Sequence, residues 1–343
     1  MSFQRNIYFF QNISRLGLLA LLFFLCILGL AAQTVRKAHR GIIIVEQDSL
    51  VRAMEPFCPV AGRAEAYSAV VNDYKSRLPG IRVYCMTIPT AVAFYLPDSL
   101  NAWTNNEQQG ITAIYEKLKP SVKSIDLFPV LGLHADEDIY LRTDHHWAPL
   151  GAYYAAEAFA QEADVPFLPL SDYDTCVVRN FVGTMERFSR DKSVGRLPED
   201  FIYYKPQTVD YQANRVRYSF VGRRRHKTIK AQPREVCDFF RHYDDGSPNA
   251  YSTFMGGDLN TTSIFTSTKN GRRLLVLKDS YGNALSSFLF GSFEEIHVVD
   301  CRYFTQNIIH FAKERQITDV LFANNLLLAY TPTTSQKLRQ YLK

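Results

Sequence analysis

The sequence lacks any Cys-x-x-Cys pair, and its six cysteines are spread along 343 residues. It therefore offers no zinc-ribbon or dithiol redox motif. It also lacks a strong excess of charge of one sign, because the formal net charge is only +5, so composition gives no case for a nucleic-acid partner. Internal repeats and low-complexity segments are absent. Apolar residues are abundant: 47% of the chain is hydrophobic and 13% aromatic, which is enough to form a full core.

A long apolar run lies near the N-terminus. Residues 16–32 carry no charge, two arginines precede them, and Gly29 and Ala31 offer the small residues of a cleavage site. The length falls between a signal-peptide core and a short membrane span. We expect residues 1–35 to form a signal peptide or membrane anchor and the body to be exported, either periplasmic or attached to the inner membrane facing the periplasm. The alternative, a buried helix of a cytosolic protein, is disfavoured because core helices rarely lack polar residues over this length.

From residue 41 onward, strand-like runs alternate with segments of helical spacing. The predicted strands are 41–51 with its turn, 81–90, 122–130, 272–280, 294–300 and 318–325. The predicted helices are 62–78, 106–119, 149–163, 281–291, 304–315 and 334–343. This alternation indicates an α/β fold with a parallel sheet covered on both faces.

Residues 165–262 interrupt this alternation. They are rich in Tyr, Arg and Asp with short alternating runs, a pattern typical of β-hairpins and loops. We interpret them as a β-rich insertion into a main domain that spans 41–343. The basic run 222–227 lies between two strand-like runs and is predicted to be a solvated hairpin tip. A role in gripping an acidic polysaccharide is the alternative for this run.

Polar residues follow several predicted strands, at the positions where functional sites of parallel sheets collect. These groups are residues 144–147, 279–280 and 300–303. In the second group, a serine at a strand-to-helix turn would project its hydroxyl beside backbone N–H groups that can stabilise an oxyanion. The simpler interpretation is that Asp279 or Ser280 only caps the following helix.

The first group supplies what a serine nucleophile needs, a base and an acid that orients it. In an extended segment, Asp144 can accept a hydrogen bond from Nδ1 of His146, which leaves Nε2 free for Ser280. His145 would point elsewhere, because alternate residues face opposite sides. Trp147 could wall the site and exclude water.

A metal site is the competing interpretation of the same residues. Asp144, His145 and His146 could all act as ligands, with three acidic residues at 136–138 just upstream. However, no second cluster of ligand residues appears elsewhere in the sequence. We therefore expect neither a metal nor a cofactor, and a purely structural polar loop is the remaining alternative.

Several stretches resemble one known family. They are YCMTIPTAVAFY, YLRTDHHWAPLGAYY, FVGTMERFS, LLVLKDSYGNAL and VVDCRYF. Together they resemble the DHHW protein family, which is similar to the alginate O-acetyltransferases of the AlgX and AlgJ type, exported enzymes related to SGNH hydrolases. The DHHW tetrapeptide about 135 residues before KDSYGN is the specific part of this signal.

The resemblance implies a three-layer SGNH-hydrolase-like sandwich and a Ser-His-Asp triad of Ser280, His146 and Asp144. The order is permuted relative to ordinary SGNH hydrolases, and Lys278 stands where their Gly-Asp-Ser motif has glycine. Oxyanion and substrate-binding roles therefore fall to several candidates. These are the backbone N–H of Ser280 or Tyr281, Arg302, Trp147, Asn283 and Asn324.

The function implied is that of an O-acetyltransferase or acetylesterase acting on cell-envelope or secreted polysaccharide. Its partners would be a polysaccharide acceptor, an acyl donor and polysaccharide-assembly proteins. The alternative from another class is a non-catalytic carbohydrate-binding or assembly protein that keeps the same fold. Hydrogen-bond contact between the imidazole of His146 and Ser280 would favour the enzyme.

Overall fold

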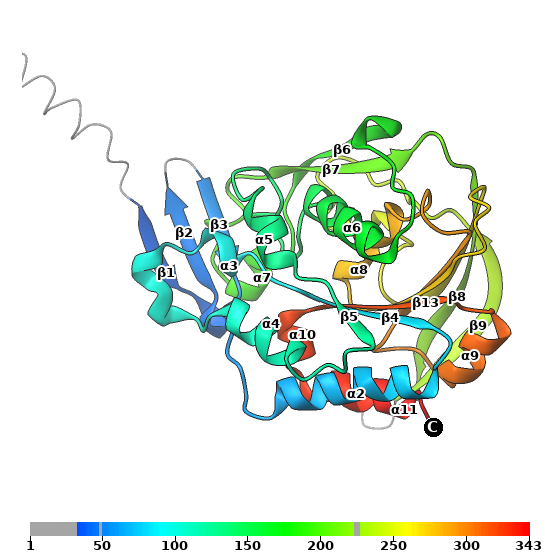
Figure 1. The fold of residues 1–343 in the computed structure, drawn as a ribbon. Coiled ribbons are helices and arrows are strands. Elements are labelled where there is room, and N and C mark those ends of the chain that lie inside the picture. Colours follow the sequence, from blue (N-terminus) through cyan, green and yellow to red (C-terminus); the bar gives the residue numbers. More distant parts are fainter. Residues whose placement is uncertain (1–32, 48–49, 223–226) are drawn as a thin grey trace, which may run out of the picture.

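The computed structural model describes residues 33–47, 50–222 and 227–343 (Figure 1). The apolar run 16–32 lies outside these ranges, so its role as a signal peptide or anchor stays a prediction. Among the described helices, none combines the length and apolar character needed to cross a membrane.

An eight-stranded sheet forms the centre of the molecule. Its order is β5 (Val122–Ser124), β4 (Arg82–Ile88), β13 (Asp319–Asn325), β11 (Arg273–Lys278), β12 (Glu295–Asp300), β10 (Asn260–Thr266), β8 (Tyr211–Val221) and β9 (Thr228–Cys237). Strands β5 to β12 of this order are parallel, whereas β10, β8 and β9 pair antiparallel. The predicted α/β fold with a parallel sheet is confirmed. Strands β8 and β9 from the 165–262 region extend that sheet, together with β10, which starts at the end of this region.

Helices cover both faces of this sheet and so form a three-layer arrangement (Figure 1). Along β11, Leu274 and Val276 contribute to one apolar core, while Leu275 and Leu277 contribute to the other. This alternation follows from the two-residue period of a strand. The first core includes α5 (Leu127–Gly132), α6 (Pro149–Ala163) and α8 (Tyr281–Ser287). The second includes α2 (Arg63–Arg77), α4 (Glu107–Tyr115), α9 (Ile308–Glu314), α10 (Leu326–Ala329) and α11 (Pro332–Gln340).

Two smaller antiparallel sheets lie beside the central one. One consists of β1 (Thr34–Lys37), β2 (Ile43–Gln47) and β3 (Leu50–Met54), and the other of β6 (Tyr173–Phe181) and β7 (Glu199–Pro206). The predicted strand at 41–51 is thus β2 and the start of β3, and it does not belong to the main sheet. The short helices α3 (Val92–Tyr95) and α7 (Met185–Ser189) complete the described elements that bear on the site.

One predicted strand is much shorter than expected. Strand β5 ends at Ser124, so the prediction of a strand over 122–130 is wrong beyond that residue. The side chain of Asp126 accepts a hydrogen bond from the N–H of Phe128 at 3.0 Å and caps α5, which starts at Leu127. A capping aspartate therefore outweighs the apolar run that follows it.

Strands β8 and β9 pair directly, as the hairpin interpretation of this region requires. Residues 223–226, which form most of the basic run at 222–227, lie outside the described part of the chain. Because β12 and β8 are both antiparallel to β10, the end of β8 at Val221 lies at the same sheet edge as the end of β12 at Asp300.

Candidate active site

The structure brings the serine and histidine of two distant segments together at the carboxyl edge of the sheet. Ser280 lies between the end of β11 and the start of α8. Its Oγ is 2.7 Å from Nε2 of His146, and Nδ1 of the same ring is 2.5 Å from Oδ1 of Asp144. All three side chains are buried, with exposed fractions of 3 to 7%. Both ring nitrogens of His146 are therefore engaged, one by a hydroxyl and the other by a carboxylate.

Asp144 is held by more than the histidine. Its Oδ2 accepts hydrogen bonds from the backbone N–H and the hydroxyl of Thr184, both at 2.8 Å. Burial by itself favours the neutral acid, but the charge and hydrogen bond of His146, the ring of His145 and the N–H of Thr184 outweigh it. They hold the pKa of Asp144 well below its usual range. The group is thus fixed as a carboxylate that orients the imidazole.

The segment that presents Asp144 and His146 is a tight loop. Its ends pair through an antiparallel bridge between Tyr140 and Trp147. Within the loop, the hydroxyl and backbone N–H of Thr143 both donate to Oε1 of Glu199 at 2.6 Å. The side chain of Glu199 on β7 therefore fastens the loop to the second small sheet.

An aromatic ring covers the imidazole. Tyr251 stacks on His146 with ring centroids 3.7 Å apart and planes 6° apart. Its hydroxyl also donates to the carbonyl oxygen of Ser280 at 3.0 Å. Tyr251 thus contacts both the imidazole of His146 and the backbone of Ser280, and it comes from the 165–262 region.

Trp147 and Tyr281, the two aromatic residues proposed from the sequence, lie in the core beneath the site. Nε1 of Trp147 donates to the carbonyl oxygen of Tyr281 at 3.1 Å, and the Tyr281 hydroxyl donates to the carbonyl oxygen of His145 at 2.6 Å. Both side chains are buried. They join the DHHW loop to the start of α8, and burial raises the pKa of Tyr281 well above its usual value.

Asp279 shapes the turn that carries the serine. Its carboxylate accepts hydrogen bonds from the N–H groups of Tyr281 at 2.9 Å and Asn325 at 2.7 Å. Burial raises its pKa to about 6 although these N–H groups favour the charged form. Because Asp279 occupies the N–H of Tyr281, that group is not free to bind an oxyanion. The N–H of Ser280 has no acceptor among the described residues.

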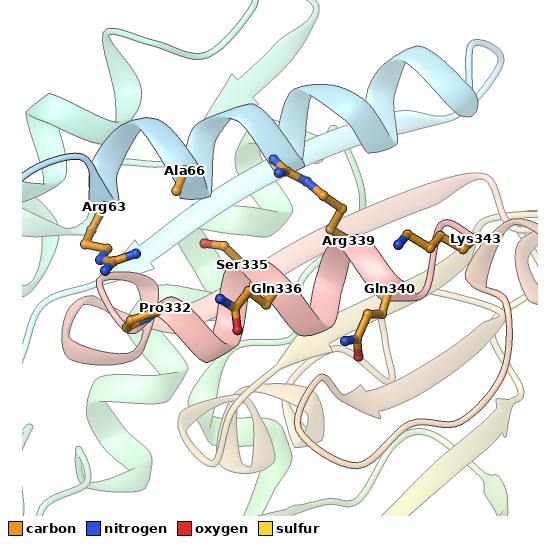
Figure 2. A pocket seen from close by; sticks show the side chains of 8 residues that line it. All are labelled: Arg63, Ala66, Pro332, Ser335, Gln336, Arg339, Gln340 and Lys343. Atoms are coloured by element: carbon orange, nitrogen blue, oxygen red, sulfur yellow. The ribbon is translucent and has the colours of Figure 1, made fainter.

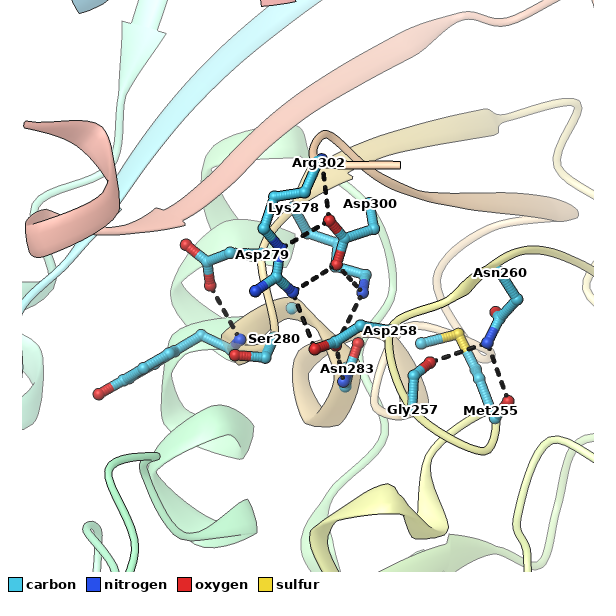
Figure 3. A network of polar contacts seen from close by, with 12 residues as sticks. Met255, Gly257, Asp258, Asn260, Lys278, Asp279, Ser280, Asn283, Asp300 and Arg302 are labelled. Carbon is cyan, nitrogen blue, oxygen red and sulfur yellow. Dashed lines mark hydrogen bonds and ion pairs between the residues drawn. The ribbon is translucent and has the colours of Figure 1, made fainter. Parts of the chain in front are cut away.

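A charged network lies next to this turn (Figure 3). Asp258 accepts a hydrogen bond from Nδ2 of Asn283 at 2.8 Å and pairs with Nη2 of Arg302 at 2.9 Å. Arg302 also pairs with Asp300 at 2.6 Å, and Lys278 contacts the same carboxylate at 2.9 Å. The amide N–H of Asn283 is therefore engaged, while its Oδ1 is buried and lacks a partner among the described residues.

The remaining asparagine candidate lies deeper. Asn324 is fully buried, and its Oδ1 accepts a hydrogen bond from the hydroxyl of Tyr67 at 2.7 Å. Tyr67 belongs to α2, which packs on the face of the sheet that carries the second core. The hydrogen bond to Tyr67 thus ties the side chain of Asn324 to α2.

Asp144, His145 and His146 form a three-residue group that could bind a metal in the described chain. Most of its ligand atoms are already engaged, however. Both nitrogens of His146 have partners, and Nδ1 of His145 lies 2.7 Å from the hydroxyl of Thr184. Both carboxylate oxygens of Asp144 also accept hydrogen bonds. The arrangement fits proton transfer between a hydroxyl and a carboxylate-bound imidazole better than coordination of an ion.

Sequence reasoning missed three residues that complete the site: Thr184, Tyr251 and Asp258. All lie in the 165–262 region, far from the segments with regular α/β spacing. For Thr184, the signal in the sequence is the preceding glycine, Gly183. The structure explains this glycine, because a Cβ atom there would overlap the side chain of Asp144. A second signal is the Gly256-Gly257 pair before Asp258, since both glycines adopt positive φ angles of 74° and 96°.

Comparisons with known proteins agree with the motifs. A family model described as DHHW protein matches residues 41–299. A DHHW family protein from Eubacterium siraeum is 35% identical, covers 90% of this chain and 98% of its own, and superposes with a TM-score of 0.78. Bacillus cereus PatB1 is 20% identical over 85% of this chain and 97% of its own, with a TM-score of 0.65.

The O-acetyltransferase domain of Pseudomonas putida AlgJ matches more distantly, at 14% identity and a TM-score of 0.43 over 90% of this chain and 99% of its own. Among curated proteins nothing matches. The family model spans most of the chain, and the Eubacterium siraeum protein is similar to it in both sequence and fold. The chain therefore belongs to the DHHW protein family.

Proposed function

We propose that this protein is an acyl-serine enzyme that transfers an acetyl group to a carbohydrate hydroxyl. Acetylester hydrolysis is the same reaction with water as the acceptor. One observation carries the proposal: the imidazole of His146 bridges the hydroxyl of Ser280 and the carboxylate of Asp144, at 2.7 and 2.5 Å. A protein that only bound carbohydrate would have no need for this relay.

In the first step, the Oγ of Ser280 attacks the carbonyl carbon of the acetyl donor while Nε2 of His146 takes its proton. The resulting imidazolium is stabilised by Asp144. The donor's alcohol then leaves with the proton from His146, and an acetyl-serine ester is formed. In the second step, His146 deprotonates the acceptor hydroxyl, whose oxygen attacks the carbonyl carbon of this ester. The bond from the acetyl group to Oγ of Ser280 breaks, His146 returns the proton to Oγ, and the acetylated acceptor leaves.

The negative oxygen of each tetrahedral intermediate needs hydrogen-bond donors. The backbone N–H of Ser280 is the best candidate, because it has no acceptor among the described residues. Arg302 is a second candidate, because its contacts place the guanidinium near the start of α8, the helix that follows Ser280. The guanidinium pairs with Asp258, and Asp258 binds Asn283 on the first turn of α8. The N–H of Tyr281 is excluded because Asp279 occupies it.

The carbohydrate acceptor follows from the resemblance of the DHHW motifs to enzymes that acetylate exported polysaccharides. Export through the apolar run 16–32 belongs to the same proposal.

Intact-mass spectrometry after incubation with p-nitrophenyl acetate tests the proposal. The wild-type protein should gain one acetyl group, and Ser280→Ala should gain none. Ser287→Ala is the matched control, because Ser287 is also a buried serine of α8 and its hydroxyl only donates to the carbonyl oxygen of Ala284. If the wild type neither forms the adduct nor hydrolyses the ester, the enzyme proposal fails and the binding role takes its place.

A further inference from the structure

A groove opens on the same sheet edge as Ser280. It encloses about 630 Å³ between the end of β8, the start of β9, the loop after β12 and the end of α11. Its connection to the candidate active site is Arg302, which lines the groove and also pairs with Asp258 beside α8. Phe220 lies at this place because β8 ends at the same sheet edge as β12.

The groove is lined by side chains of the types that bind sugars in proteins. Aromatic rings of Phe220, Tyr303 and Tyr341 line it, and Phe220 and Tyr303 meet edge to face with centroids 6.1 Å apart. The loop after β12 adds the amides of Gln306 and Asn307. Aromatic rings pack against the apolar faces of sugar rings, and amides exchange hydrogen bonds with hydroxyls.

The charge of the groove is of one sign. Lys227, Lys337 and Lys343 line it together with Arg302, and no Asp or Glu side chain of the described residues does so. Arg302 is largely neutralised by Asp258 and Asp300, so the excess charge comes from the side chains of the three lysines. The lysine ion pairs within the described chain involve Lys117, Lys123 and Lys278, and none of the three groove lysines. Positive charge in a concave surface attracts anionic ligands.

A second hollow continues this surface between α2 and α11 (Figure 2). It encloses about 400 Å³ and shares Gln340 and Lys343 with the groove. Arg63 and Arg339 line it, again without a carboxylate side chain from the described residues. The basic surface thus extends beyond the groove to the hollow between α2 and α11.

We infer that the groove binds the acceptor as an anionic glycan, one that carries carboxylate or phosphate groups. The aromatic rings would hold sugar rings, and Lys227 and Lys337 would face the anions. Arg302 would mark the end at which an acceptor hydroxyl reaches Ser280. This inference rests on the proposed transfer reaction for its purpose, but the binding itself does not require turnover.

The test is a direct binding measurement in the absence of any acyl donor, so that catalysis plays no part. Titration calorimetry would compare oligogalacturonate, a neutral galactan oligomer of equal length and a phosphorylated mannan. We expect at least one anionic glycan to bind more tightly than the neutral oligomer and to lose affinity as salt rises. Tighter binding by the uronate or by the phosphorylated chain alone would identify which anion the groove selects.

The double variant Lys227→Gln/Lys337→Gln should weaken binding of the anionic glycan roughly threefold to tenfold and flatten its salt dependence. The matched control is Lys192→Gln/Arg196→Gln, which removes the same charge from an exposed segment that does not line the groove. Thermal melting of both variants checks folding. Equal binding of charged and neutral glycans, or equal loss in the control, would overturn the inference. A missing acetyl adduct would instead contradict the catalytic proposal.

Discussion

The phenol ring of Tyr251 lies flat on the imidazole of His146, with centroids 3.7 Å and planes 6° apart. This contact fixes the plane of the ring that links Ser280 to Asp144. The position of the tyrosine ring is also held by its hydroxyl, which donates to the carbonyl oxygen of Ser280 at 3.0 Å. One side chain thus contacts both the imidazole of His146 and the backbone of Ser280.

Replacing Tyr251 should therefore slow catalysis without weakening binding of a small ester. For Tyr251→Leu, we expect kcat for p-nitrophenyl acetate to fall roughly threefold to tenfold, because an aromatic pair contributes about 0.5–1.5 kcal/mol. KM should stay near the wild-type value. Tyr251→Phe keeps the stacking, so it should retain most of kcat and lose about 1 kcal/mol of stability with the hydrogen bond to Ser280. Equal kcat in Tyr251→Leu and wild type would remove the positioning role.

Asp144→Asn tests the orienting acid. The amide can no longer stabilise a charged imidazolium, and it also disturbs the hydrogen bonds from Thr184. We expect kcat to fall on the order of a thousandfold or more, as when the acid of a Ser-His-Asp triad becomes an amide. Stopped-flow release of p-nitrophenol measures this. Asp136→Asn, an exposed aspartate upstream of the same loop, should leave the rate unchanged.

The parts of the fold with regular spacing were predictable from the sequence. Helix α6 begins and ends where the pattern places it, at Pro149 and Ala163, because proline suits the first turn and an unbroken apolar stripe follows. Strands β11 and β12 were predictable within about two residues, because each is a short apolar run. Segment 122–130 was not, since the capping hydrogen bond of Asp126 that ends the strand depends on a single side chain.

The candidate site divides in the same way. Asp144, His146 and Ser280 could be proposed because each carries recognisable chemistry. Ser280 does follow a strand, whereas Asp144 and His146 lie in a loop and not at the strand end that the pattern predicts. Tyr251 could not, because a stacked tyrosine is indistinguishable in sequence from any other of the 20 in the chain. Asp258 likewise acquires its role only through contacts with Arg302 and Asn283, which β10 and the turn before it bring together in the folded chain.

A buried acid outside the site should give stability a distinct pH dependence. Burial raises the pKa of Glu107 to about 7, against an ordinary value of 4.5, although Thr90 donates two hydrogen bonds to its carboxylate at 2.7 Å. Below about pH 4.5 the group is neutral in both folded and unfolded chains. As pH rises toward 7, the unfolded chain loses this proton first, so the contribution of Glu107 to the free energy of unfolding falls and then levels off.

Glu107→Gln should remove this dependence, because the amide does not ionise. Relative to wild type, the variant should gain stability between pH 4.5 and 7, by a change on the order of 2 to 3 kcal/mol. Urea unfolding of both proteins across this range measures the difference. Glu116→Gln, at an exposed position just beyond the same helix, should track the wild type. A pH-independent difference for Glu107→Gln would show that Glu107 ionises normally in the folded chain.

Gly183 gives the sharpest steric test of the site. A Cβ atom there would overlap both the Cβ and the carboxylate of Asp144. The Asp144 side chain cannot move away without losing the hydrogen bond that the N–H of Thr184 donates to its carboxylate. We expect Gly183→Ala to cost about 1–3 kcal/mol of stability, as overpacking does, and to lower the rate of acetyl-adduct formation by displacing Asp144. Gly80→Ala is the matched control, because the added Cβ would have no neighbour within 4 Å. Thermal melting and intact-mass kinetics on both variants decide the matter. If Gly183→Ala melts and reacts like Gly80→Ala, the close packing of this glycine against Asp144 is not what holds the carboxylate in place.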